Sequence, residues 1–165
     1  TVHSLSKLLA LYKNIQFTLI APNELAMPDD IVSLIENAGH RVTITDQLAG
    51  NLNADIVYQT RIQEERFPSQ EEANKYRGKF RLNRSIYTQH CKSNTVIMHP
   101  LPRDSRAQAN ELDNDLNSHP NLAIFRQADN GLLIRMALFA LTLGVDSQLE
   151  KYECPVNWYS RKADR

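Results

Sequence analysis

The fold of this chain is decided by the stretch Thr95-Val96-Ile97-Met98-His99-Pro100-Leu101-Pro102-Arg103. Its first four residues favour a short buried strand, and the prolines at positions 100 and 102 exclude continued pairing in a sheet. Because proline has no backbone N–H, this Pro-Leu-Pro loop (residues 100–102) offers carbonyl acceptors and few donors. Ligands of parallel α/β sheets bind beyond the carboxyl ends of the strands, so the loop predicts a site for a ligand that carries N–H groups. The alternative is a stiff surface turn that binds nothing.

Strands and helices alternate along the rest of the chain. Apolar and β-branched runs predict strands at 16–21, 41–45, 55–58 and 95–98, and helical periodicity predicts helices at 1–12, 28–38, 84–90 and 131–143. This alternation indicates an α/β fold, with three α/β/α layers and a mainly parallel sheet of four to five strands. The helix at 131–143 is almost wholly apolar, which predicts that it is buried on most sides.

Length and charge limit the classes of function. A chain of 165 residues with 42% hydrophobic residues suits one domain with a single core. Its 19 basic and 19 acidic residues give a formal charge of zero, so we expect no nucleic-acid or membrane partner. The apolar run at 136–143 is too short to cross a bilayer, and no glycine-rich phosphate-binding pattern is present.

The cysteines and histidines give no sign of a metal centre. Cys91 and Cys154 stand far apart, so we expect free thiols, which are typical of a reducing compartment and hence of a cytoplasmic protein. The five histidines lack metal-ligand spacing and a neighbouring nucleophile, and only His99 lies beside the predicted cavity. The chain starts at Thr1 without an initiator methionine or a leader, so we expect a processed chain or a piece of a longer protein.

Candidate binding residues follow the third and fourth expected strands. Both strand ends open on the same side of a parallel sheet, so Arg61 and the carbonyls of the Pro-Leu-Pro loop are expected to face one cavity. The planar fork of an arginine matches a carboxylate through two hydrogen bonds, and Gln63 would add an amide to the same ligand. The alternative is a solvated surface, on which Arg61 and Arg66 pair with the glutamates at positions 64 and 65 and contribute little energy.

The order of several motifs resembles that of the aspartate carbamoyltransferase family. The matching segments are Thr1-Val2-His3-Ser4-Leu5, Tyr58-Gln59-Thr60-Arg61-Ile62-Gln63-Glu64-Glu65-Arg66, His99-Pro100-Leu101-Pro102-Arg103, and Phe125-Arg126-Gln127 with Asn130-Gly131 and Arg135-Met136-Ala137-Leu138. The resemblance covers roughly residues 1–144 and implies the aspartate-binding, carboxyl-terminal half of that enzyme, followed by an extension at 145–165. The related ornithine enzymes carry a cysteine where Pro100 stands, so the proline favours aspartate as the second substrate.

The resemblance also implies a reaction and a set of roles. In the family, the amine of L-aspartate attacks the carbonyl carbon of carbamoyl phosphate and expels phosphate, which gives N-carbamoyl-L-aspartate for pyrimidine biosynthesis. The implied residues are Thr1, Arg61 and Gln63 for aspartate, the carbonyls of Pro100, Leu101 and Pro102 for the carbamoyl NH2 and the amine, and Arg103 and Arg135 as supports of the loop. Attack by an amine needs orientation and oxyanion stabilisation, so no cofactor, metal or catalytic nucleophile is implied. A homotrimer is implied for the full-length protein, and a regulatory chain is left open.

The chain also departs from the family. The carbamoyl-phosphate-binding half is absent, so we expect these residues alone to be inactive. Residues 104–109 resemble an insertion, Asn110 stands in place of an acid, and the tail at 145–165 extends past the usual end of the family. In the tail, Trp158 and Tyr159 are expected to cover an apolar patch, to contact a neighbouring subunit, or to be ordinary surface residues. Other functions left open are a non-catalytic scaffold or regulatory module, a transferase for a different amine, and a flavodoxin-like or receiver-like binding domain.

Overall fold

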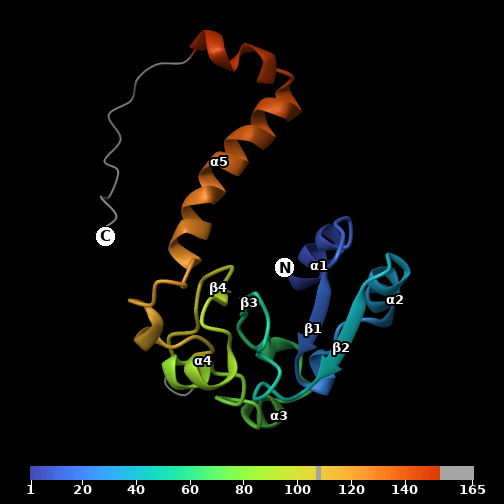
Figure 1. The fold of residues 1–165 in the computed structure, drawn as a ribbon, viewed down its shortest axis with the longest axis vertical. Helices are drawn as coiled ribbons and strands as arrows, with labels where there is room; N and C mark the ends of the chain where they lie inside the picture. The colour runs from blue at the N-terminus through green and yellow to red at the C-terminus, as the bar shows by residue number, and fades with distance from the viewer. Residues whose placement is uncertain (107–108, 153–165) are drawn as a thin grey trace. The chain divides into compact units, whose positions relative to one another are not determined.

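The computed structural model describes residues 1–106 and 109–152. These residues fall into two units, one up to Gln127 and one from Ala128 onward. The strands are β1 (Gln16–Ile20), β2 (Arg41–Thr45), β3 (Ile56–Tyr58) and β4 (Val96–Met98) (Figure 1). The helices are α1 (Val2–Leu9), α2 (Asp29–Asn37), α3 (Gln70–Asn74), α4 (Arg84–His90) and α5 (Ile124–Leu143). Short 3-10 turns lie at η1 (Asn23–Leu25), η2 (Glu64–Arg66), η3 (Asn114–Leu116) and η4 (Asp146–Tyr152).

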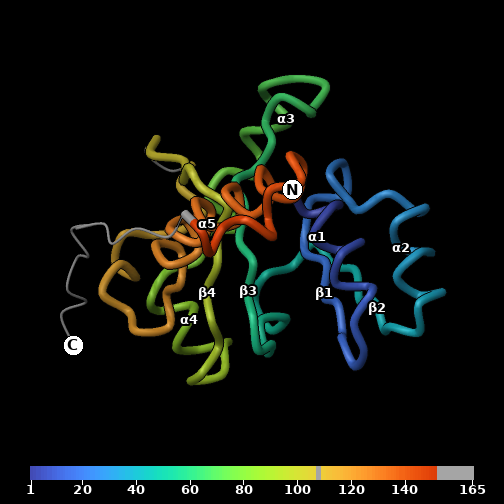
Figure 2. Tube along the Cα trace, turned by 90° about the horizontal axis from the view of Figure 1, so that it is seen from above, coloured from blue at the N-terminus to red at the C-terminus, as the bar shows by residue number. Residues whose placement is uncertain are grey.

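The strands of the first unit form two parallel pairs. β1 pairs with β2, with Gln16 opposite Arg41, and β3 pairs with β4, with Val57 opposite Ile97. The strands follow one another in the order β2, β1, β3, β4 (Figure 2), and Leu122 forms an isolated parallel bridge with Ile97. The predicted α/β fold with parallel strands is therefore confirmed. The structure differs from the prediction in one respect: β1 and β3 share no hydrogen-bonded ladder, so the four strands form two parallel pairs and not a single sheet. Residues of β1 and β3 line a common pocket.

Particular residues in the sequence account for where α2 and α4 begin and where α2 ends. Asp29 and Asp30 occupy the first turn of α2, where the helix dipole favours negative charge. The chain leaves α2 at Gly39, whose φ of 88° lies in the left-handed region that glycine adopts without strain. The side chain of Asn83 accepts a hydrogen bond from the N–H of Ile86 at 2.8 Å and so begins α4. The predicted helices at 28–38 and 84–90 are thus confirmed to within a residue or two of each end.

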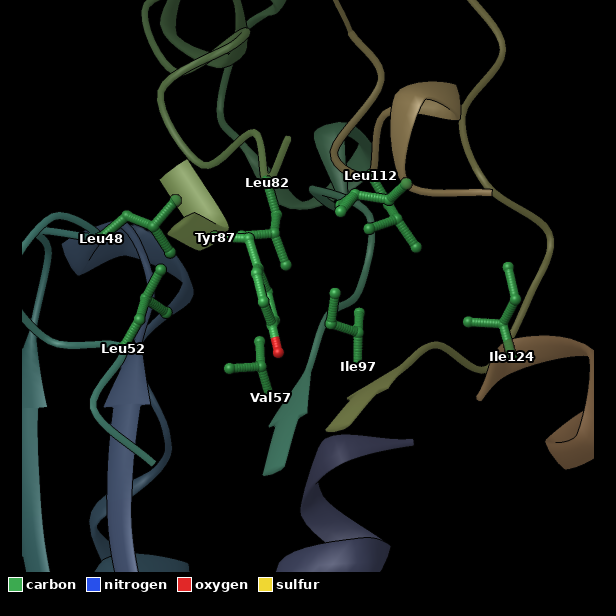
Figure 3. Close-up of a cluster of buried hydrophobic side chains, with 9 residues drawn as sticks. Leu48, Leu52, Val57, Leu82, Tyr87, Ile97, Leu112 and Ile124 are labelled. Atoms are coloured by element: carbon green, nitrogen blue, oxygen red, sulfur yellow. The ribbon is translucent and has the colours of Figure 1, made fainter. Parts of the chain in front are cut away.

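The main hydrophobic core lies around β3 and β4 (Figure 3). Its buried members are Leu48, Leu52, Val57, Leu82, Tyr87, Ile97, Leu112, Leu116 and Ile124. A second buried cluster consists of Ala10, Phe17, Ile31 and Ile35. Ile97 is fully buried at the centre of β4, and Leu101 packs against the same core. The core therefore fixes both the strand and the Pro-Leu-Pro loop that follows it.

α5 begins at Ile124, earlier than the predicted start at 131, and ends at Leu143 as predicted. Its side chains at 132–139 are exposed, with Leu133 at 64% and Phe139 at 67%, so the prediction of burial on most sides is wrong for this chain. The physical reason is that the described part of the second unit holds only the rest of α5 and η4, too little chain to cover a 20-residue helix. Among the residues described, no helix combines the length and the apolar content needed to cross a membrane.

Candidate functional site

A pocket of about 740 Å³ runs along β1 and β3 and extends to the residues that follow β1, β3 and β4. Its lining includes all of the predicted substrate-binding residues: Thr1, Arg61, Gln63, Pro100, Leu101 and Pro102. The volume is within the range of small-molecule sites, and strand ends of a parallel sheet are where such sites occur. The structure therefore brings a forked cation and the Pro-Leu-Pro loop to one cavity, although the residues are about forty positions apart in the sequence.

The backbone of the Pro-Leu-Pro loop presents acceptors only. Pro100 and Pro102 have no N–H, and the N–H of Leu101 donates a hydrogen bond to Nδ1 of His99 at 2.9 Å. Leu101 has a φ of 56°, in a region that leucine seldom adopts, and a cis peptide bond joins it to Pro102. Within residues 1–106 and 109–152, no group donates a hydrogen bond to the carbonyl oxygens of this loop. These oxygens are therefore available to a ligand in the pocket.

Arg61 already has a carboxylate partner. Its guanidinium donates to both oxygens of Glu65, at 2.6 and 3.1 Å, and to the carbonyl of Ile62 at 3.3 Å. The hydrogen bond with Glu65 raises the pKa of Arg61 and lowers the pKa of Glu65. The exposed ion pair that the alternative predicts is therefore present between Arg61 and Glu65, whose side chains are 42% and 54% exposed, and the role of Arg61 in binding stays a prediction. The same pair holds the guanidinium at the wall of the pocket.

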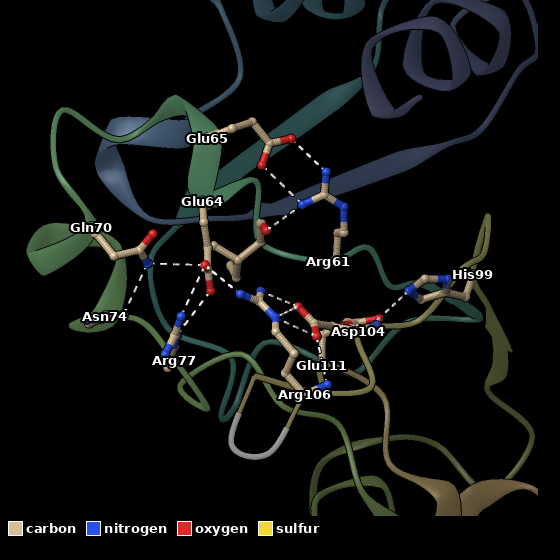
Figure 4. A network of polar contacts seen from close by, with 11 residues as sticks. Arg61, Glu64, Glu65, Gln70, Asn74, Arg77, His99, Asp104, Arg106 and Glu111 are labelled. Carbon is tan, nitrogen blue, oxygen red and sulfur yellow. Dashed lines mark hydrogen bonds and ion pairs between the residues drawn. The ribbon is translucent and has the colours of Figure 1, made fainter.

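Glu64 lies at the centre of a polar network that the sequence did not reveal (Figure 4). Its carboxylate accepts hydrogen bonds from Arg77 at 3.1 and 3.2 Å, from Arg106 at 3.1 Å and from Gln70 at 3.2 Å. Arg106 also pairs with Asp104 at 2.5 Å. Hydrogen bonding, from Arg77 first, lowers the pKa of Glu64 to about 2, and the bond from Arg106 lowers the pKa of Asp104 to about 2. The network therefore ties the apparent insertion to the loop that carries Arg61.

This network predicts a loss of stability in acid. Folding lowers the pKa of both carboxyls, so the unfolded chain binds more protons as the pH falls. Their contribution to the free energy of unfolding should be complete above about pH 5 and be lost on approach to about pH 2. We expect a loss of about 1 kcal/mol per carboxyl, because their partly exposed arginine partners are screened by solvent. Urea unfolding of the chain at about pH 7, 4 and 2.5, followed by circular dichroism, measures this loss.

The matched variants for this measurement are Glu64→Gln and Glu36→Gln. Glu64→Gln removes the charge at the centre of the network and should flatten the pH dependence. Glu36 is an exposed residue of α2, and its replacement should leave the pH dependence as it is in the wild type. A Glu64→Gln protein that loses as much stability in acid as the wild type would contradict the prediction.

The predicted supporting arginines are not part of the pocket lining. Arg103 donates to the side chain of Asn117 at 2.8 Å and lines a separate groove of about 720 Å³. Arg135 lies on α5 in the second unit, so its support of the Pro-Leu-Pro loop stays a prediction. The division into a domain at 1–144 and an extension at 145–165 also stays a prediction.

Of the two cysteines, the structure describes Cys91. Cys91 is a free thiol, and burial raises its pKa to about 11, which makes it a poor nucleophile. Cys154, Trp158 and Tyr159 lie outside the described residues.

Comparison with known proteins decides the family. Residues 1–142 match the family described as aspartate/ornithine carbamoyltransferase, Asp/Orn binding domain. The chain belongs to the aspartate/ornithine carbamoyltransferase family. The resemblance inferred from the motifs is therefore confirmed, and the pocket described above is a feature of an Asp/Orn binding domain.

Relatives of this Asp/Orn binding domain are about twice its length. The chain is 67% identical over 161 residues to the aspartate carbamoyltransferase catalytic subunit of Cellvibrio japonicus and 64% identical over 160 residues to that of Saccharophagus degradans. These matches cover 97% and 96% of this chain but 48% of each relative. An aspartate transcarbamoylase from Trypanosoma cruzi, solved in complex with carbamoyl phosphate and aspartate, matches with a TM-score of 0.71 at 33% identity, over 84% of this chain and 45% of that one. The chain thus spans about half the length of the curated relatives that it matches.

Proposed function

We propose that this chain is the aspartate-binding half of an aspartate carbamoyltransferase, which transfers the carbamoyl group of carbamoyl phosphate to the amine of L-aspartate. The observation that carries this proposal is that Arg61 and the Pro-Leu-Pro loop line one cavity. Aspartate combines carboxylates with an amine, and the cavity offers a complement to each group. The names of the relatives, and the Trypanosoma cruzi complex with both substrates, support the same reaction.

In this proposal the chain positions the substrates and supplies no nucleophile. Arg61 binds a carboxylate of aspartate through two N–H groups, with Gln63 and Thr1 beside it in the lining. The carbonyls of the Pro-Leu-Pro loop accept hydrogen bonds from the carbamoyl NH2 and from the attacking amine. The amine nitrogen bonds to the carbamoyl carbon, the bond from that carbon to the phosphate oxygen breaks, phosphate leaves with the electron pair, and the nitrogen gives up a proton. Orientation and charge stabilisation are the contributions expected from the protein.

The wider setting is proposed on the same basis. We propose that the full-length protein is a cytoplasmic homotrimer in pyrimidine biosynthesis, and that these residues alone are inactive because they lack the carbamoyl-phosphate-binding half. The relatives, twice as long as this chain, support the second point.

Substrate preference tests the proposal. The full-length protein that carries this chain is assayed with carbamoyl phosphate and either L-aspartate or L-ornithine. We expect turnover with aspartate and a preference over ornithine of more than about 100-fold in kcat/KM, because ornithine brings an amine where the site offers a cation for a carboxylate.

The same assay separates the alternatives. Equal kcat/KM for the two amino acids would overturn the assignment of aspartate and favour a transferase for a different amine. Binding of both substrates without turnover would favour a non-catalytic module. Turnover by residues 1–165 alone, at the rate of the full-length protein, would contradict their description as half of an active enzyme.

A further inference from the structure

His99, the residue before the Pro-Leu-Pro loop, forms a buried pair with Glu111 (Figure 4). Nε2 of His99 lies 2.7 Å from Oε1 of Glu111, and both side chains are 1% exposed. Burying a carboxylate is costly unless hydrogen bonds satisfy it, and here they do. Glu111 also accepts from the N–H of Asp104, at 3.3 and 3.2 Å to its two oxygens. The pair is therefore a satisfied structural unit and not a solvated surface contact.

The hydrogen bonds fix the state of the histidine ring. Nδ1 of His99 accepts from the N–H of Leu101 at 2.9 Å, so this nitrogen carries no proton. The remaining ring nitrogen, Nε2, then carries the proton of the neutral imidazole and donates it to Glu111. Both ring nitrogens are occupied in this way, so His99 is not free to exchange a proton with a ligand.

Together the two side chains hold both ends of the loop. His99 binds the N–H of Leu101, and Glu111 binds the N–H of Asp104, two residues beyond the last proline. The backbone N–H of His99 is held in turn by the side chain of Gln127 at 3.0 Å. Glu111 is anchored through its own carbonyl, which accepts from the N–H of the buried Leu82 at 2.8 Å. These contacts use the N–H groups of His99, Leu101 and Asp104, and no described residue donates to the carbonyls of the loop.

We propose that His99 and Glu111 are positioning residues of the transfer reaction, which hold the Pro-Leu-Pro loop so that its carbonyl oxygens remain aligned for the amine and the carbamoyl NH2. This inference rests on the proposed function, because it assigns the pair a role in that reaction. It assigns a role in the reaction to Glu111, which follows the loop in the sequence and stands twelve positions after His99.

Two substitutions of His99 separate its two hydrogen bonds. His99→Gln keeps a donor within reach of Glu111 but no acceptor beside Leu101, whereas His99→Asn keeps an acceptor near the place of Nδ1. In the full-length enzyme we expect kcat to fall about 10- to 100-fold in His99→Gln and by less than about 10-fold in His99→Asn. Glu111→Gln places a donor against the N–H of Asp104 and should lower kcat as His99→Gln does.

A split between chemistry and binding distinguishes positioning from a loss of fold. The KM for aspartate, and the binding of succinate, which has both carboxylates but no amine, should change by less than about three-fold in these variants. His40 provides the control, since it is also buried and its Nε2 lies 3.1 Å from the carbonyl of Ala10, away from the pocket lining. His40→Asn should lower the thermal midpoint and leave kcat unchanged. Wild-type kcat in His99→Gln and Glu111→Gln would overturn the proposal.

A spectroscopic measurement on the wild type completes the test. In the full-length protein labelled with 15N-histidine, we expect His99 to be neutral, with its proton on Nε2, and the amide of Leu101 to be protected from exchange. A proton on Nδ1 would overturn the proposal whether or not the variants fold. A different result would contradict the proposed function: the wild-type protein would show no turnover, although His99 is neutral with its proton on Nε2.

Discussion

Arg61→Ala in the full-length protein should lower kcat/KM for aspartate by about 10²- to 10⁴-fold while the thermal midpoint stays within a few degrees. The loss follows from the two charge-assisted hydrogen bonds proposed to the substrate, since each such bond contributes roughly 1.5–3 kcal/mol. The fold should be unaffected, because Arg61 is 42% exposed and its pair with Glu65 contributes little to stability. Steady-state kinetics with varied aspartate, together with a thermal melt, measure both quantities.

Two further variants sharpen this result. Arg61→Lys keeps the charge and loses the planar fork, so its kcat/KM should lie between those of the wild type and Arg61→Ala. Arg41 is an exposed arginine of β2 outside the pocket lining, and Arg41→Ala should behave as the wild type. Unchanged kinetics in Arg61→Ala would remove this residue from the substrate site.

The second large effect is expected on stability. Ile97→Ala should lower the free energy of unfolding by roughly 2–5 kcal/mol, because it leaves a cavity in the centre of the main core. Ile97 is fully buried, pairs with Val57 on β3 and bridges to Leu122 on its other side. A domain of this size has only about 5–15 kcal/mol in total, so much of the native population should be lost on mild heating. Urea unfolding monitored by circular dichroism gives the difference.

Ile44→Ala is the matched control for this variant. Ile44 is also an isoleucine in a parallel strand, but its side chain is 55% exposed on β2. Its replacement should cost less than about 1 kcal/mol, since little apolar surface is returned to water. Similar losses in the two variants would contradict the description of β4 as the centre of the core.

Local sequence signals were sufficient to predict the strands, and to predict that the loops after β3 and β4 lie close together. Strand 95–98 is apolar and β-branched, and it ends at a proline that cannot pair, so both its existence and its end are encoded within a few residues. The parallel arrangement then places the residues after β3 and β4 at one edge of the sheet. That single geometric rule accounts for Arg61 and Pro100 lining the same pocket.

The contacts that the sequence did not predict are long-range. Glu64 meets Arg77 and Arg106 from 13 and 42 positions away, and His99 meets Glu111 across the apparent insertion. Local periodicity cannot predict such pairs, because they depend on the course of the loops, which the sequence pattern does not define. The burial expected of α5 failed for a related reason: an apolar sequence indicates that a helix requires a cover, but it does not say where the covering chain lies.

A surface made only of carbonyl oxygens, such as the Pro-Leu-Pro loop, holds an ammonium group with three N–H donors more tightly than a neutral amine with two. The form that binds best is then the form without the lone pair needed for attack. As the solution becomes more alkaline, the hold on the nucleophile weakens while its reactive fraction grows. Tight capture of an amine by such a surface is therefore no measure of rapid transfer, and the catalyst must also provide the ammonium proton with a way to leave.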